Sequence, residues 1–110
     1  MSLTRIALAG AAALTFLGLA GAASAETTWE QHHPRQDQVL DRIQRQERRI
    51  AEARREDELG RWQAHRLWAH DRFIARQDHR FARINGGYIT PGEQHYLNRE
   101  EDGLGRHIPG

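Results

Sequence analysis

The stretch that most constrains this chain is residues 85–93, where a double glycine is followed directly by a helix-start signal. Gly86 and Gly87 can adopt positive φ without a steric penalty, which is how many helices end. Thr90 suits the N-cap of a new helix that begins with proline, and Glu93 is placed to accept a hydrogen bond from the Thr90 amide. The sequence therefore predicts two helices that meet at a turn capped by Gly86, Gly87, Thr90 and Glu93.

Residues 1–25 have the three-part pattern of a secretory signal peptide. Arg5 supplies the positive start, residues 6–20 are apolar, and Ala23-Ser24-Ala25 is a small-residue cleavage site. The apolar run is shorter than the ~20 residues that span hydrocarbon and is rich in Gly and Ala, which argues against a membrane anchor. We therefore expect cleavage before Glu26 and a periplasmic location.

Composition excludes several classes of function. The chain has 16 basic and 15 acidic residues, and Arg5 leaves with the signal, so the remaining segment is balanced and gives no reason to expect nucleic-acid binding. That segment has no Cys, Ser, Lys or Met, which excludes disulfides, the commonest covalent nucleophiles and soft copper sites. No catalytic or cofactor motif is present, so we expect neither an enzyme nor a small-molecule substrate.

Helical periodicity divides the exported segment into a flexible lead-in (26–34), a helical domain (35–106) and a tail (107–110) that we expect to be loose. The expected helices are 35–58, 61–85 and 91–106, joined by tight turns at Gly60 and at the double glycine. The predicted fold is all-α, with two long helices and a shorter third in a hairpin-like arrangement.

Apolar residues recur at helical spacing in each predicted helix. The first has the narrow stripe Val39, Ile43, Ile50 and Ala53, and the third has Leu97, Glu101, Leu104 and Ile108. In the second, six large residues fall within roughly 140° of a helical wheel and are predicted to form the main core face: Trp62, Leu67, Phe73, Ile74, Phe81 and Ile84. Trp68 lies off this arc. Because a small chain hardly covers so much apolar surface, we expect self-association as a two-fold dimer.

The second predicted helix also carries a ridge of arginines: Arg72, Arg76, Arg80 and Arg83. Only Asp71 and Asp78 are acidic in this helix, whereas the third helix has a net negative charge. Two interpretations stay open. Acids of the third helix or of a neighbouring subunit offset the ridge, or the ridge binds an anionic partner such as a membrane surface, lipopolysaccharide or an acidic client.

The chain has seven histidines, but their spacing predicts no preformed metal site. A helical chelate needs partners three or four residues apart, whereas His65 and His70 are five apart. A metal site would have to be assembled between helices or between chains. His70 falls in the middle of the predicted core arc, where burial would lower its pKa and make it pH-sensitive. The alternative is an ordinary boundary histidine hydrogen-bonded to Gln77.

A weak repeat with a period of 30 residues is also present. It aligns Leu59 with Ile89, Gln63 with Glu93, His65 with His95, Leu67 with Leu97 and Asp71 with Glu101. Two helix-loop-helix units would produce this pattern.

Short motifs across the exported segment resemble a group of small secreted helical proteins of Gram-negative bacteria. The motifs are His33-Pro34-Arg35, Gly86-Gly87, Ile89-Thr90, Glu93-Gln94 and Leu97-Asn98. More distantly, the stretches 59–63 and 89–93 are similar to the L-T-x-x-Q motif of CpxP/Spy-like periplasmic stress proteins. This resemblance implies a helical fold and a chaperone-like role in envelope stress, and it brings no catalytic residues.

The sequence thus favours a non-enzymatic periplasmic protein that binds other proteins or itself through amphipathic surfaces. The alternative is a His-rich, metal- or acid-responsive binding module.

Overall fold

The computed structural model describes residues 26–110, and the predicted signal peptide at 1–25 lies outside the described residues. The described part is helical throughout, without a strand: α2 (Thr28–His32), α3 (Pro34–Arg55), α4 (Arg61–Ile84) and α5 (Pro91–Gly105). The predicted all-α fold with two long helices and a shorter third is confirmed. Of the described residues, 26–32 and those from His33 onward belong to separate units, so each is described by itself.

The lead-in, expected to be flexible, contains the five-residue helix α2. Its start is a capping box, in which the Glu30 amide donates to Thr27 Oγ1 at 3.1 Å and the Thr27 amide donates to Glu30 Oε1 at 2.8 Å. These two hydrogen bonds satisfy backbone donors that a helix start otherwise leaves without partners. This segment therefore has local helical structure of its own.

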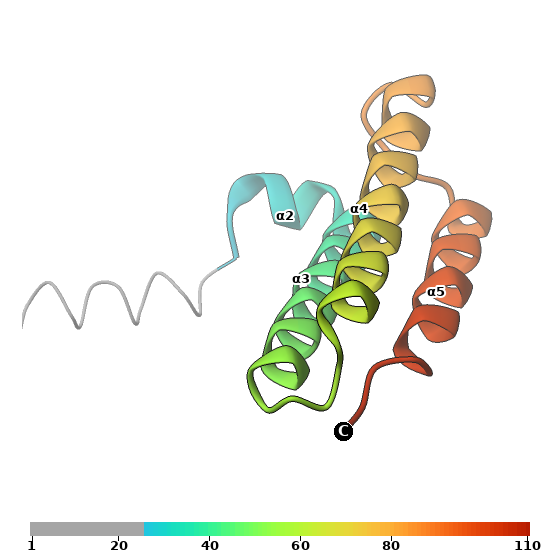
Figure 1. The fold of residues 1–110 in the computed structure, drawn as a ribbon. Helices are drawn as coiled ribbons and strands as arrows, with labels where there is room; N and C mark the ends of the chain where they lie inside the picture. The colour runs from blue at the N-terminus through green and yellow to red at the C-terminus, as the bar shows by residue number, and fades with distance from the viewer. Residues whose placement is uncertain (1–25) are drawn as a thin grey trace, which may run out of the picture. The chain divides into compact units, whose positions relative to one another are not determined.

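Helices α3, α4 and α5 form a three-helix bundle in which each helix packs on the other two (Figure 1). The chain runs along α3, returns along α4 and reverses again into α5, so α3 and α5 are parallel. In agreement with this, Gln36 near the start of α3 donates to Asp78 near the end of α4 at 2.9 Å. Gln38 of α3 and the Asn98 side chain in α5 exchange two hydrogen bonds of 3.1 and 2.9 Å.

The predicted apolar stripes of α3 and α5 both lie in the core. All four residues of the α3 stripe are buried, and so are Leu97, Glu101, Leu104 and Ile108. Ile108 belongs to the segment that we expected to be a loose tail, yet it is buried and its carbonyl accepts a hydrogen bond of 3.1 Å from Arg49. The chain beyond α5 is therefore part of the packed bundle as far as this residue.

The core face predicted for α4 is only half correct, since Leu67 and Phe81 are partly buried against the core but other members of the arc lie outside it. Ile74 is buried, but Trp62, Phe73 and Ile84 are exposed by 69, 47 and 71%. The buried positions of α4 are instead Ala64, Asp71, Ile74, Ala75, Asp78 and Ala82. Three of these are alanines, whose small side chains let α3 and α5 approach the α4 backbone closely. A helical wheel that weights large apolar residues overlooks such a face. The face of α4 that is actually buried consists mainly of small and acidic side chains.

The turn between α3 and α4 is closed by backbone hydrogen bonds. Asp57 adopts a positive φ of 58°, and the Glu58 amide donates to the Ala53 carbonyl at 2.9 Å, as in helix ends of the Schellman type. This left-handed residue ends α3 at Arg55, before the predicted Glu58. The Gly60 amide then donates to Gln63 Oε1 at 2.8 Å, which caps the start of α4.

The turn between α4 and α5 has the predicted chemistry. Gly86 and Gly87 have φ of 72° and 106°, and the Gly87 amide donates to the Ala82 carbonyl at 2.6 Å. The Thr90 amide donates to Glu93 Oε1 at 2.8 Å, while the Glu93 amide donates to Thr90 Oγ1 at 3.1 Å. This reciprocal pair is the capping box expected from the sequence.

The period of 30 residues corresponds to equivalent positions at the starts of α4 and α5. Leu59 and Ile89 are both buried directly before a helix N-cap. Gln63 and Glu93 each stand at the third helical position and accept a hydrogen bond from the N-cap amide. The repeat therefore marks two helix starts with the same local construction, and its last pair, Asp71 and Glu101, meets in the core.

Candidate functional site

Two acidic side chains face each other inside the bundle. Asp71 of α4 and Glu101 of α5 are both 0% exposed, and their carboxyl groups lie within hydrogen-bonding reach of each other. All four carboxyl oxygens lack any other hydrogen-bond partner. Two ionised carboxylates cannot share such a place, because like charges repel and no donor is present to satisfy them. The geometry therefore requires a proton between Asp71 and Glu101.

The direction of the pKa shifts agrees with this arrangement. Burial, together with the hydrogen bond to Glu101 and the charges of Glu101 and Glu47, raises the pKa of Asp71 to about 9. Burial also raises the pKa of Glu101, although the hydrogen bond from Asp71 and the charge of Arg42 act in the opposite direction. At neutral pH we therefore assign the shared proton to Asp71, which donates it to the Glu101 carboxylate.

A third buried acid, Asp78, lies two turns further along α4. Its Oδ2 accepts a hydrogen bond of 2.9 Å from Gln36 of α3, whereas its Oδ1 has no partner. Burial raises the pKa of Asp78, and the Gln36 hydrogen bond and the charge of His79 partly offset the rise. The acids of α4 are thus directed inward at both of its neighbours, one at α5 and one at α3.

The opposite side of α4 is apolar and basic. We call it the α4 outer face and define it by seven exposed residues: Trp62, Arg66, Phe73, Arg76, Arg80, Arg83 and Ile84. Trp62, Phe73 and Ile84 are spaced eleven residues apart, so they fall within about 40° of one another on a helical wheel. They lie in one line along the helix, on the half of the predicted arc that the bundle leaves uncovered.

Neighbouring helices mark the two edges of the α4 outer face. On one side Arg72 donates to Glu47 of α3 at 3.0 Å, and on the other Gln77 donates to the Tyr96 hydroxyl of α5 at 3.3 Å. Phe81 meets Tyr96 at the same edge, with ring centroids 6.1 Å apart. Between these contacts the helix surface is open to solvent.

The structure separates the members of the predicted arginine ridge. Arg72 is paired with Glu47, an acid of α3 rather than of α5. Among residues 26–110, no ion pair involves Arg76, Arg80 or Arg83. Three of the four α5 acids are engaged elsewhere, since Asp102 pairs with Arg42, Glu93 caps its own helix and Glu101 faces Asp71. Among the described residues, no α5 acid forms an ion pair with the ridge, and offset by a neighbouring subunit and binding of an anionic partner both stay open.

The unpaired arginines line a groove with a volume of about 520 Å³. Its lining residues are Phe73, Arg76, Gln77, His79, Arg80 and Arg83. The Arg76 guanidinium lies 5.8 Å from the centre of the Phe73 ring, close enough for a cation–π contact. This combination of aromatic surface and fixed positive charge suits an anionic, partly apolar partner.

His70 is exposed, so the prediction that it lies buried in the core is wrong. Its proposed partner, Gln77, donates to Tyr96 instead. Within the described part of the chain, no histidine belongs to a group of three or more side chains that could share a metal ion. His33 has a different role, since its ring stacks on Tyr88 with centroids 4.5 Å apart.

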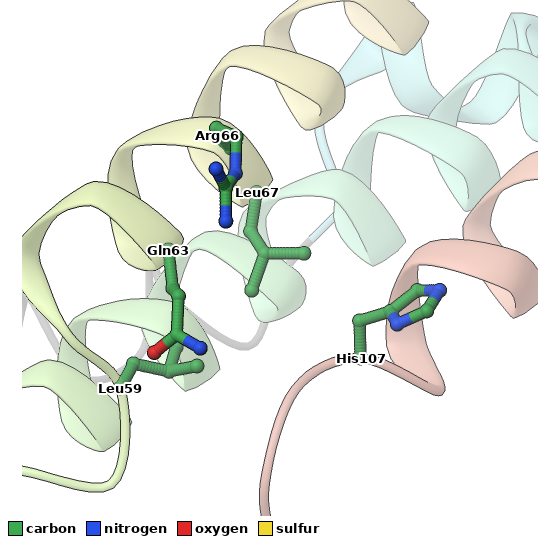
Figure 2. Close-up of a pocket in the computed structure, with 5 residues that line it drawn as sticks. All are labelled: Leu59, Gln63, Arg66, Leu67 and His107. Atoms are coloured by element: carbon green, nitrogen blue, oxygen red, sulfur yellow. The ribbon is translucent and has the colours of Figure 1, made fainter.

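Two further pockets lie near the start of α4. The first, with a volume of about 310 Å³, is lined by Leu59, Gln63, Arg66, Leu67 and His107. Figure 2 shows His107, from the segment after α5, across this pocket from the α4 side chains. The second, of about 370 Å³, lies between α3 and α4 beside Trp68, which is partly exposed. Neither pocket is lined by a paired acid and base or by a nucleophile, so neither suggests a reaction.

Within residues 26–110, none of the helices combines the length and apolar character needed to cross a bilayer. Comparisons of the chain with protein-family models, with curated proteins and with solved structures found no match. The resemblance to CpxP/Spy-like proteins is therefore untested and stays a prediction.

Sequence reasoning missed the buried acids and the orientation of α4. One signal was available, because the repeat aligned Asp71 with Glu101 and the apolar spacing of the third helix already included Glu101. A second signal was the regular placement of Ala64, Asp71, Ala75, Asp78 and Ala82, which recur at steps of three, four or seven residues. These positions define the face that is actually buried.

Proposed function

We propose that this protein acts by binding rather than by catalysis, and that it contacts other proteins or a second copy of itself through the α4 outer face. The observation that carries the proposal is the exposed line of Trp62, Phe73 and Ile84. Large apolar side chains aligned on one solvent-facing surface are typical of interaction sites. The secretory pattern of residues 1–25 supports a periplasmic location, where a CpxP/Spy-like protein would bind clients exposed by envelope stress.

The absence of the commonest covalent nucleophiles from residues 26–110 supports the non-enzymatic assignment. The described chain has no Ser, Cys or Lys, and its buried carboxyl pair does not line any of the three pockets described above. The Asp71–Glu101 proton is enclosed between helices, so a substrate could not reach it without opening the bundle. We therefore assign this pair to the fold and the α4 outer face to function.

A client-aggregation assay tests the proposal. Reduced insulin chains aggregate in solution, and the resulting light scattering should fall when the purified protein is added. The variant Trp62→Gln/Phe73→Gln/Ile84→Gln should lose this effect while keeping its helical circular dichroism, because all three side chains are exposed. Trp68→Gln changes an exposed ring on another side of α4 and serves as the matched control.

Self-association is measured on the same variants by sedimentation equilibrium. A wild-type dimer that dissociates in the triple variant would support binding to a second copy. The proposal would be overturned if the wild type neither self-associates nor suppresses aggregation, or if the triple variant behaves as the wild type does in both assays.

A second candidate is an acid-responsive binding module, which the Asp71–Glu101 pair favours. Since this pair binds a proton in the folded state, lowering the pH should raise the free energy of unfolding of the bundle. The protein would then keep its α4 outer face intact in acid that unfolds its clients. A wild-type protein that loses structure or stability between pH 8 and pH 5 would contradict this candidate.

A further inference from the structure

The inner and outer sides of α4 differ completely in charge. Its only acids, Asp71 and Asp78, are 0% exposed, so they contribute no negative charge to the surface of the helix. Its arginines lie outside, and Arg76, Arg80 and Arg83 form no ion pair among the described residues. The α4 outer face therefore presents uncompensated positive charge beside exposed aromatic rings.

The geometry of this face fits a flat partner. Trp62, Phe73 and Ile84 span 22 residues of one continuous helix, which corresponds to about 33 Å at the usual rise. Grooves that bind a helix use anchors three, four and seven residues apart, whereas here the anchors are eleven residues apart. Widely spaced apolar side chains in a straight line can all touch a planar surface at once, so this spacing suits a flat partner.

The arginines between the anchors fit the same surface. Each has an apolar stem that can lie along acyl chains while the guanidinium stays at the level of lipid phosphates. Arg61 lies 5.6 Å from the Trp62 ring centre and Arg76 lies 5.8 Å from that of Phe73, so basic groups flank the aromatic anchors. The groove lined by Arg76, Arg80 and Arg83 can bind an anionic headgroup.

We propose that the α4 outer face also docks the bundle on an anionic lipid bilayer, an inference that rests on the proposed function of this face in binding. The helix lies along the membrane surface, with Trp62, Phe73 and Ile84 in the interfacial region and the arginines on the headgroup phosphates. The bundle core stays folded, because the three anchors are already exposed in the free protein.

Co-sedimentation with vesicles tests this docking. Wild-type protein should pellet with vesicles of phosphatidylcholine and phosphatidylglycerol but not with phosphatidylcholine alone, and added salt should release it. Tryptophan emission should shift to the blue on binding, as the Trp62 indole leaves water. Trp62→Gln/Phe73→Gln/Ile84→Gln should remove the pelleting, whereas Trp68→Gln should retain it.

Charge variants distinguish binding through the α4 outer face from general electrostatic attraction between a basic surface and anionic vesicles. Arg76→Gln/Arg80→Gln/Arg83→Gln should weaken binding about a hundredfold, taking about fivefold for each arginine near an anionic surface. Arg45→Gln/Arg48→Gln/Arg99→Gln removes the same net charge from exposed positions on α3 and α5 and should weaken it less than about tenfold.

The docking proposal is overturned if the wild type stays in the supernatant with anionic vesicles, if it binds neutral vesicles equally, or if both charge variants lose equal affinity. The insulin assay keeps this failure distinct from failure of the proposed function. Protein that ignores vesicles but suppresses aggregation through the same face binds proteins and not lipid. Protein that ignores vesicles, does not suppress aggregation and does not self-associate refutes both proposals.

Discussion

Replacing Asp71 by Asn tests the shared proton directly. Burial raises the pKa of Asp71 from its ordinary 3.8 to about 9. Between these values the folded chain holds a proton that the unfolded chain has released. The free energy of unfolding must then fall as pH rises through this window, by about 1.4 kcal/mol for each pH unit. From pH 5 to pH 7 the loss amounts to about 2.7 kcal/mol.

The side-chain amide that Asp71→Asn introduces needs no added proton and can donate to Glu101 in place of the shared proton. We therefore expect the variant to have a much flatter pH profile between pH 5 and 8. At pH 8 it should be more stable than the wild type by at least about 2 kcal/mol, although most substitutions at buried sites destabilise. The acids whose pKa is lowered, Glu52, Glu93 and Asp102, lose their contribution only as pH falls through the more acid range, so they do not mask the effect.

Urea unfolding followed by far-UV circular dichroism at pH 5, 6, 7 and 8 measures both profiles. Asp41→Asn, at an exposed position of α3, is the matched control and should keep the wild-type slope. A wild-type stability that is constant or rises from pH 5 to 8 would refute the reasoning. An Asp71→Asn variant that is less stable than the wild type at every pH would do the same.

Three further predictions concern local structure and export. A Cβ at Gly105 would lie 2.8 Å from the Gln46 amide nitrogen, which donates to the Glu101 carbonyl in the core, so Gly105→Ala should displace this buried amide and destabilise the bundle by about 1 kcal/mol. A Cβ at Gly103 would lie no nearer than 3.8 Å to any atom considered, so Gly103→Ala should raise the free energy of unfolding by up to about 1 kcal/mol. Chemical denaturation compares the two variants. Thr90→Ala should cost about 1 kcal/mol through loss of the α5 N-cap, whereas Thr28→Ala, outside the bundle unit, should leave its thermal melt unchanged. Intact-mass measurement of the periplasmic fraction should find a chain beginning at Glu26, and a mass that retains residues 1–25 would contradict cleavage.

The sequence predicted the parts of the fold that local chemistry determines. The double glycine, Thr90 and Glu93 specify a helix end and a helix start within nine residues, and the structure has both. The stripes of α3 and α5 were also correct, because each of these helices has a single narrow set of apolar positions to bury. In such cases the residues of one segment contain enough information to define its buried face.

The orientation of α4 could not be obtained in the same way. Its apolar arc is wider than the bundle can cover, so the choice of buried face depends on which side lets two other helices approach. Ala64, Ala75 and Ala82 provide that approach, and Phe73 and Trp62 are left outside. Burial of Asp71 became acceptable only because Glu101 stands opposite on another helix. The prediction that His70 is buried failed for the same reason, because it was based on the apolar arc of α4 and not on the face that the bundle buries.

The buried acids and the exposed anchors are two consequences of one rotation of α4. Turning the helix to bury its large apolar residues would bring Asp71 and Asp78 toward solvent, where each could ionise without penalty. The bundle does the opposite and accepts a buried carboxyl pair that must hold a proton. A fold selected for stability alone has no reason to bury two acids and expose Trp62, Phe73 and Ile84 on the same helix. The arrangement is understandable if the α4 outer face has to be both apolar and free of negative charge, which is what contact with an anionic surface requires.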